Sequence, residues 1–340
     1  STMANGVYDW LTRLGGNDRV NRINTTWFAK FDILKGLNFE TKVNYQRRNK
    51  EKNVYPTPWE RWNFATGTLV SEKGSPETYE TTYMYEKDYM ITVDNVLRYS
   101  TTIAKDHDIS ALVGHNEYYK KYYDFSSTKR GLIDGSLHSN DMANQVVQAE
   151  GREYDFGMRS FFGRLNYAYK SKYLFEANIR RDGSSRFAKD SRWGSFPSFS
   201  VAWRLSEEDF VGDSFRDLFQ NFKLKASWGK LGNSITKLGE STRTTTGGIT
   251  KINEKEEYYA YSNSYTNKDS YYSFGGNSAQ SLIIKLLGNP DLKWEATRVL
   301  NFGLEAATLN NRLTVELEYS DRYTDGILNT IEIPDVMGTK

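Results

Sequence analysis

Aromatic side chains gather in two segments that we expect to be loops, and they have the clearest binding chemistry in the sequence. The segments are residues 49–81 and 229–297. Flat rings pack against the apolar faces of a ligand or a partner, while polar neighbours fix its orientation. Exposed loops commonly carry such contacts. The alternative is that the rings pack the loops against each other or against a partner. The candidates are Tyr55, Trp59, Trp62 and Phe64 in the first segment, and Tyr258, Tyr259, Tyr261, Tyr265, Tyr271, Tyr272 and Phe274 in the second.

Motifs for catalysis or nucleotide binding do not occur. The sequence has no G-x-S-x-G, no P-loop, no H-E-x-x-H and no EF-hand series. Cysteine is absent, which removes thiol catalysis and cysteine-ligated zinc. The spacing of His107, His115 and His138 matches no metal motif. We therefore expect no enzymatic activity, no cofactor and no metal site.

Charge and hydropathy limit the class of protein. The formal net charge of the 340 residues is +2, which gives no electrostatic case for nucleic acid. No apolar run approaches the roughly 18 residues of a spanning helix, and the mean hydropathy is −0.69. A soluble protein is one interpretation, but barrel strands bury only alternate residues in lipid and escape hydropathy windows. The first residues lack the pattern of a secretory signal, which suggests a cytosolic protein or a piece of a longer chain.

The elements that must position the aromatic loops are β-strands. Apolar and polar residues alternate in about ten segments, which predicts strands with one apolar face. The link at residues 206–220 is the one place where we expect a short helix. The predicted strands are Trp27–Ile33, Leu37–Arg48, Thr82–Ile103, His107–Phe125, Phe161–Tyr169, Tyr173–Arg181, Ser198–Leu205, Asn221–Trp228, Leu300–Ala306 and Leu313–Tyr319.

The connections between these strands alternate in length. Short ones fall at residues 35–36, 104–106, 170–172 and 309–311, and long ones at 49–81, 126–160 and 229–297. The connection at 182–197 is longer than the turns, and that at 206–220 is intermediate. Short turns on one rim and long loops on the other are typical of a membrane barrel. We therefore expect the apolar face to lie against lipid, although a protein core is the other possibility.

Two further features agree with a barrel. Segments 82–103 and 107–125 exceed the usual strand length of about five or six residues. Tyrosines gather near strand ends, as in the aromatic girdles of membrane barrels, although ordinary edge or core tyrosine explains them equally well. These tyrosines are Tyr45, Tyr99, Tyr169, Tyr173, Tyr319 and Tyr323.

Three blocks, in this order, resemble the SusC/RagA-type TonB-dependent outer-membrane transporters. The first is GRLNYAYKSKYLFEANIRRDGSSRFAKDSRWGSFPSFSVAWRLSEEDF at residues 163–210. The second is KLKASWGKLGN at 223–233, and the third is the stretch at 287–329 that begins LGNPDLKWE. The resemblance covers roughly residues 20–335 and is weakest in the first hundred residues.

The resemblance implies a fold and a function. Family members form a large plugged barrel of the 22-stranded class, so residues 1–340 are expected to be a middle part of an all-β, antiparallel barrel domain. The signal peptide, N-terminal extension, TonB-contacting segment, plug and remaining strands would be absent from this chain. The implied activity is import of glycan oligomers or peptides across the outer membrane of a Gram-negative bacterium. The implied partners are TonB–ExbB–ExbD, a SusD-like surface lipoprotein and outer-membrane lipid.

Within this interpretation, the two aromatic clusters would dock sugar rings or contact the lipoprotein. The rival is an outer-membrane glycan-binding or adhesin barrel that does not transport, and a more distant one is a soluble all-β binding module. In the DGSSRF stretch, Asp182 and Arg186 are expected to belong to a turn held by Asp, Gly and Ser. Charges on the polar face suit a wet interior or a plug surface, but pairing between neighbouring strands is favoured. They are Arg164, Glu176, Arg180, Lys223, Lys225, Glu316 and Glu318.

Overall fold

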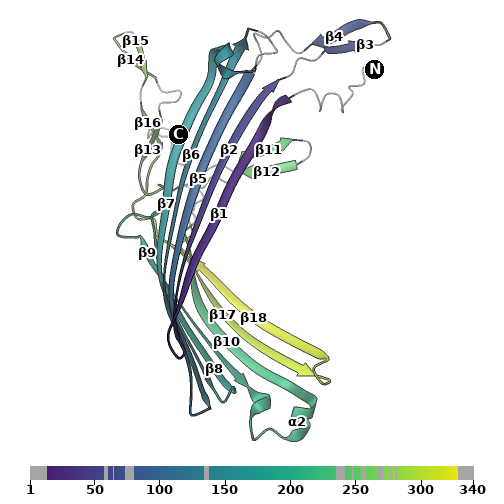
Figure 1. The fold of residues 1–340 in the computed structure, drawn as a ribbon, viewed down its shortest axis with the longest axis vertical. Coiled ribbons are helices and arrows are strands. Elements are labelled where there is room, and N and C mark those ends of the chain that lie inside the picture. The colour runs from purple at the N-terminus through teal and green to yellow at the C-terminus, as the bar shows by residue number, and fades with distance from the viewer. Residues whose placement is uncertain are drawn as a thin grey trace. The chain divides into compact units, whose positions relative to one another are not determined.

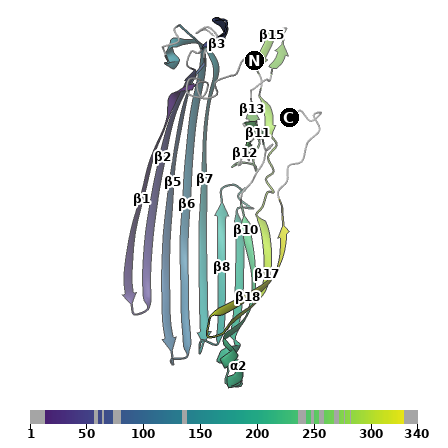
Figure 2. The ribbon, with the colours of Figure 1, turned by 90° about the vertical axis from the view of Figure 1, so that its right-hand side faces the viewer.

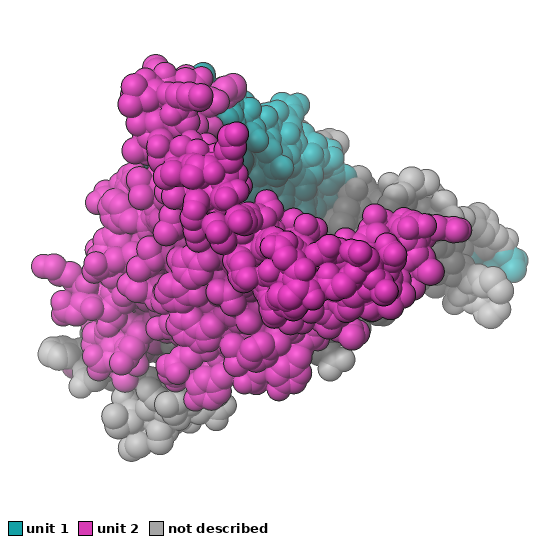
Figure 3. All heavy atoms as spheres, turned by 90° about the horizontal axis from the view of Figure 1, so that it is seen from below, with its two compact units in different colours: residues 1–27, 44–91, 119–155 teal, residues 28–43, 92–118, 156–340 magenta. Residues whose placement is uncertain are grey.

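The computed structural model describes the chain between Leu14 and Ile327, with gaps. The described residues are 14–56, 60–63, 65–72, 80–133, 138–234, 242–246, 249–253, 258–266, 271–275, 277–280 and 282–327. They fall into two compact units (Figure 3). Unit 1 comprises residues 1–27, 44–91 and 119–155, and unit 2 comprises residues 28–43, 92–118 and 156–340.

One antiparallel sheet of ten strands dominates the described chain, and its strands follow one another in sequence order (Figures 1 and 2). This confirms the predicted all-β class and the ten predicted strands. The sheet strands are β1 (Leu14–Leu34), β2 (Leu37–Pro56), β5 (Glu80–Ile103), β6 (His107–Leu132), β7 (Ala143–Tyr169), β8 (Tyr173–Ser184), β9 (Trp193–Arg204), β10 (Phe219–Asn233), β17 (Glu295–Thr308) and β18 (Leu313–Asp325).

The register places apolar residues in rows across one face of this sheet. In unit 2, one row runs through the paired residues Tyr167, Phe175, Val201, Ala226, Phe302 and Tyr319. The adjacent row on the other face runs through Asn166, Glu176, Ser200, Ser227, Asn301 and Ser320. Alternation along these strands of unit 2 therefore separates an apolar face from a polar one.

The apolar face of the sheet has no second layer over it in the described part of the chain. Ile179 is 57% exposed and Leu317 is 64% exposed, although both are large aliphatic residues. A soluble sandwich would bury these side chains against a facing sheet. Among the described residues, these apolar side chains are therefore exposed and are not packed into a protein core.

The short connections lie together at one end of the strands. Backbone hydrogen bonds tie these turns to their neighbours: Ser100 N–H on β5 donates to the Gly36 carbonyl at 2.9 Å, and Lys170 N–H donates to the Asp106 carbonyl at 2.7 Å. Lys170 and Ser171 have φ of 48° and 54°, the left-handed values of the tight hairpin turn that suits the twist of antiparallel strands.

Several strands are longer than predicted, and the loops contain strands of their own. β1 begins at Leu14, and β7 begins at Ala143, so the loop predicted at 126–160 shrinks to residues 133–142. The added strand sections lack a regular alternation of apolar and polar residues, so periodicity does not reveal them. The short elements are β3 (Glu60–Asn63) with β4 (Thr68–Glu72), β11 (Thr242–Thr246) with β12 (Ile249–Asn253), β13 (Ser264–Thr266) with β16 (Ile283–Leu286), and β14 (Tyr271–Phe274) with β15 (Asn277–Gln280).

Helices are short in the described residues. The predicted helix in the 206–220 link is present as α2 (Asp213–Leu218), preceded by a 3-10 turn at Leu205–Glu207, and a second 3-10 turn spans Asn140–Met142. Within the described chain, no helix is both long and apolar enough to cross a membrane.

Candidate functional site

In the first aromatic cluster, the structure describes the side chain of Tyr55, which lies at the end of β2. Its ring stacks on His138, with ring centroids 3.8 Å apart and planes at 6°. This ring therefore packs one connection against another. Trp59 and Phe64 lie outside the described residues, and of Trp62, on β3, the backbone alone is described. The role predicted for these three residues stays a prediction.

The second cluster divides into a packed ring and exposed rings. Tyr258 packs on Phe156, with centroids 6.0 Å apart, and on the Arg186 guanidinium, 4.6 Å from its ring. Tyr259 and Tyr265 are 37% and 59% exposed, and Tyr261 is half-buried. The backbones of Tyr271 and Tyr272 lie on β14, but their side chains are outside the described part. The binding role of the cluster remains a prediction, and the exposed rings are its best candidates.

The DGSSRF stretch forms a buried junction and is more than a turn. Arg186 is 5% exposed and lies between two rings, with Phe156 at 4.8 Å on one side and Tyr258 on the other. Asp182 accepts two hydrogen bonds of 2.8 Å from Arg180 Nε. Ser184 takes part in the expected way, because its hydroxyl accepts the Arg186 N–H at 3.3 Å. Sequence reasoning missed the role of Phe156, which lies in the part of β7 predicted as loop.

The third resembling block docks onto this junction. Phe187, which has no exposed surface, lies 5.3 Å from the Trp294 ring, and Trp294 Nε1 donates to the Arg192 carbonyl at 2.9 Å. Asn289 N–H donates to the Ala260 carbonyl at 2.9 Å. A Cβ at Gly288 would come within 2.3 Å of the Ser262 backbone, so this close approach requires glycine. The DGSSRF and NPDLKW stretches therefore fix the base of the loop that carries Tyr258 to Tyr265.

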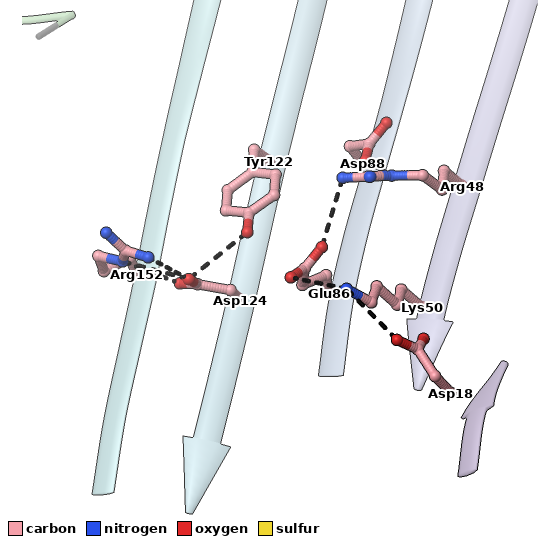
Figure 4. Close-up of polar contacts among 8 residues, drawn as sticks. All are labelled: Asp18, Arg48, Lys50, Glu86, Asp88, Tyr122, Asp124 and Arg152. Atoms are coloured by element: carbon pink, nitrogen blue, oxygen red, sulfur yellow. Dashed lines mark hydrogen bonds and ion pairs between the residues drawn. The ribbon is translucent and has the colours of Figure 1, made fainter. Parts of the chain in front are cut away.

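A polar network lies within unit 1, on one face of its strands (Figure 4). It joins side chains from β1, β2 and β5 that are far apart in the sequence. Arg48 Nε lies 2.5 Å from Asp88, and its Nη2 lies 3.4 Å from Glu86. Lys50 contacts Glu86 at 4.0 Å and Asp18 at 3.9 Å. Sequence reasoning missed this network because spacing alone could not single out pairs among 43 acidic residues.

The same face carries a tyrosine pair beside a second ion pair. Arg152 Nη2 lies 2.6 Å from Asp124, and Tyr122 stacks on Tyr154 with centroids 4.8 Å apart. Burial, followed by the charges of Glu86 and Asp124, raises the pKa of Tyr122 to about 12. The Tyr122 hydroxyl therefore stays protonated at neutral pH and donates to Asp124 at 3.5 Å.

Of the seven charges predicted on the polar face, Lys223, Lys225 and Glu316 form ion pairs between strands, as favoured from the sequence, whereas Arg180 pairs with Asp182 on its own strand. Lys223 Nζ lies 2.6 Å from Glu305, and Lys225 pairs with Glu316. Arg164 Nε donates to Asn178 at 2.7 Å. In the described residues, no group of three or more histidine and acidic side chains is placed to hold a metal ion.

Comparisons with known proteins agree with this geometry. No family model matches the chain. TonB-dependent receptor P26 of Formosa agariphila is 31% identical over 248 residues, which cover 72% of this chain and 23% of that protein. TonB-dependent receptor SusC of Bacteroides thetaiotaomicron is 36% identical over 175 residues, covering 52% of this chain and 16% of SusC.

A solved structure shows the same fold. The RagAB peptide importer in its open-open state superimposes with a TM-score of 0.77 at 22% identity, covering 97% of this chain and 32% of the RagAB chain. The chain spans about a quarter of the length of TonB-dependent receptor P39 of the same Formosa species, at 26%, while 92% of this chain is matched.

Strand order, an uncovered apolar face and these matches define the class: the chain is part of the β-barrel of a TonB-dependent receptor. Within that class it is similar to SusC over about half of its length, and it shares the fold of the RagAB structures. Its place is therefore the outer membrane of a Gram-negative bacterium, and the apolar face lies against lipid.

Proposed function

We propose that the protein to which this chain belongs imports large nutrients across the outer membrane, with energy supplied through TonB. The observation that supports this most directly is the locked loop base at Arg186 and Trp294. It holds an aromatic loop at the rim of a lipid-facing sheet whose other face is polar. A polar lining behind an apolar exterior is what a polar substrate needs to cross.

The proposed substrates are glycan oligomers or peptides. Tyr259, Tyr261 and Tyr265 offer aromatic faces for sugar rings or apolar side chains. RagAB is a peptide importer. On chemical grounds glycans are equally good candidates here, because sugars stack on tyrosine rings.

We further propose that residues 1–340 form one part of a barrel domain and that other parts of the polypeptide supply the plug and the TonB-contacting segment. A SusD-like surface lipoprotein would cover the rim where the loops lie. The exposed tyrosines of the second cluster would contact either the lipoprotein or the substrate.

An uptake experiment tests the proposal. Deletion of the gene should abolish growth on, and accumulation of, one class of oligomer, and the wild-type gene should restore both. Deletion of TonB should have the same effect on uptake while leaving surface binding intact. Binding that persists without any TonB-dependent uptake would favour the alternative, a glycan-binding or adhesin barrel that does not transport.

A further inference from the structure

An apolar groove crosses the lipid-facing side of unit 2, between two rows of paired side chains. The first row runs through Tyr167, Phe175, Val201, Ala226 and Phe302. The second row lies two residues away along each strand and runs through Tyr169, Tyr173, Trp203, Leu224 and Leu304. The groove has a volume of about 570 Å³, within the range of about 300–1,000 Å³ that is usual for ligand sites.

The small side chain of Ala226 gives the groove its depth. Its neighbours in the first row, Val201 on β9 and Phe302 on β17, are each 51% exposed, so larger side chains stand on both sides of one methyl group. One wall is formed further along the same strands, where the rings of Phe199 and Trp228 stack with centroids 6.2 Å apart and planes at 14°. The hollow at Ala226 is therefore bounded by side chains and is more than the ordinary furrow between two rows.

The opposite wall is held by one buried carboxylate. Trp203 Nε1 donates to Glu208 at 2.8 Å, and the Tyr173 hydroxyl donates to the same side chain. The polar atoms of these two rings are therefore satisfied within the protein, and their apolar faces line the groove. Because these hydrogen bonds fix the rings before a ligand arrives, binding loses little side-chain entropy at this wall.

We propose that this groove binds one acyl chain of a phospholipid. Its lining of ring faces and aliphatic groups favours a hydrocarbon ligand, because binding buries apolar surface on both partners. The groove begins at Tyr173, the first residue of β8, directly after the short turn at residues 170–172. Short turns of such barrels lie on the periplasmic rim, and the leaflet on that side consists of phospholipid.

A cation stands where the headgroup of this lipid would lie. Lys170 is exposed in the turn, and its ammonium lies 5.6 Å from the centre of the Tyr169 ring, which belongs to the second row. The ammonium is therefore on the lipid-facing side, at the end of the groove, where it suits a lipid phosphate. The proposal rests on the outer-membrane location and is independent of what the protein transports.

The test uses the intact protein in detergent, with phosphatidylethanolamine as the probe and native mass spectrometry to count the bound lipids. Ala226→Leu fills the groove while it keeps the surface apolar, and it should raise the measured Kd at least fivefold. Ala177→Leu is the matched control, because Ala177 pairs with Phe199 on the same lipid-facing side but does not line the groove, and it should leave the Kd unchanged. Val201→Phe narrows the groove from β9 and provides a second variant that should also weaken binding.

Three results would overturn the proposal. The first is an equal Kd for phosphatidylethanolamine in the wild type, Ala226→Leu and Val201→Phe. The second is binding of purified lipopolysaccharide as tightly as phosphatidylethanolamine, since the acyl chain would then have no preference for a phospholipid source. The third is a smaller purified assembly in Ala226→Leu with no change in lipid binding, which would assign the groove to a contact between copies of the protein.

Discussion

Arg186 carries the junction between the strands and the aromatic loop, because its guanidinium contacts two rings and is almost fully buried. A desolvated cation over a ring contributes about 2 kcal/mol. We expect Arg186→Ala to lower the thermal unfolding midpoint clearly, and Arg186→Lys to have an intermediate effect, since lysine keeps the charge without the flat stacking group. Lys189→Ala, at an exposed position in the same loop, is the control. Equal midpoints for all three variants would contradict the role given to Arg186.

Tyr122 is a second residue whose contribution can be tested, because it makes the stability of the fold depend on pH. Its pKa in the folded state is raised above the ordinary value of 10.0 to about 12 by burial and by the charges of Glu86 and Asp124. The stabilisation is therefore complete below pH 10 and is lost as the pH rises toward 12. Unfolding midpoints measured between pH 8 and 12 should fall less steeply in Tyr122→Phe than in the wild type. Parallel curves would show that Tyr122 does not titrate as described.

At the scale of the strand, β18 has one face that belongs to the lipid-facing series and one that belongs to the polar series. Leu317 belongs to the lipid-facing series and is 64% exposed, whereas Ser320 belongs to the polar series. An arginine on the lipid side of a barrel costs about 2–4 kcal/mol near the midplane. We expect Leu317→Arg to lower the free energy of unfolding measured in lipid vesicles by about 2–4 kcal/mol. Ser320→Arg should have little effect on it. A similar loss in both variants would mean that the lipid side is wrongly assigned.

The hairpin turns are a second feature of the elements. Lys170 and Ser171 both have positive φ, which costs little for Asn and Gly and more for other residues. The double substitution Lys170→Asn and Ser171→Gly should raise stability by about 1 kcal/mol, measured as a higher unfolding midpoint in detergent. A lower midpoint would show that Lys170 contributes more through its contact with Tyr169, over whose ring its ammonium lies at 5.6 Å.

At the scale of the whole molecule, the two edge strands of the sheet decide whether it closes into a barrel. β1 and β18 each have one neighbour in the sheet, so each has a row of backbone groups that the described residues do not pair there. In lipid such groups must be satisfied. We expect the outer-edge amides of β18 to exchange slowly with deuterium in the intact protein, because a further strand pairs with them. Rapid exchange along the whole of β18 would argue against barrel closure at this edge.

Sequence periodicity determined the ten strands, their two faces and the short turns, because alternation records directly which side of a strand meets an apolar phase. Leu313, Val315, Leu317 and Tyr319 are enough to orient β18. The extensions of β1 and β7 could not be found in this way, since their apolar and polar residues do not alternate regularly. Tertiary structure alone decided that Arg186 lies between Phe156 and Tyr258, and that Asp18, Arg48, Glu86 and Asp124 share one polar face. Those neighbours come from different strands, and sequence spacing does not encode the register that brings them together.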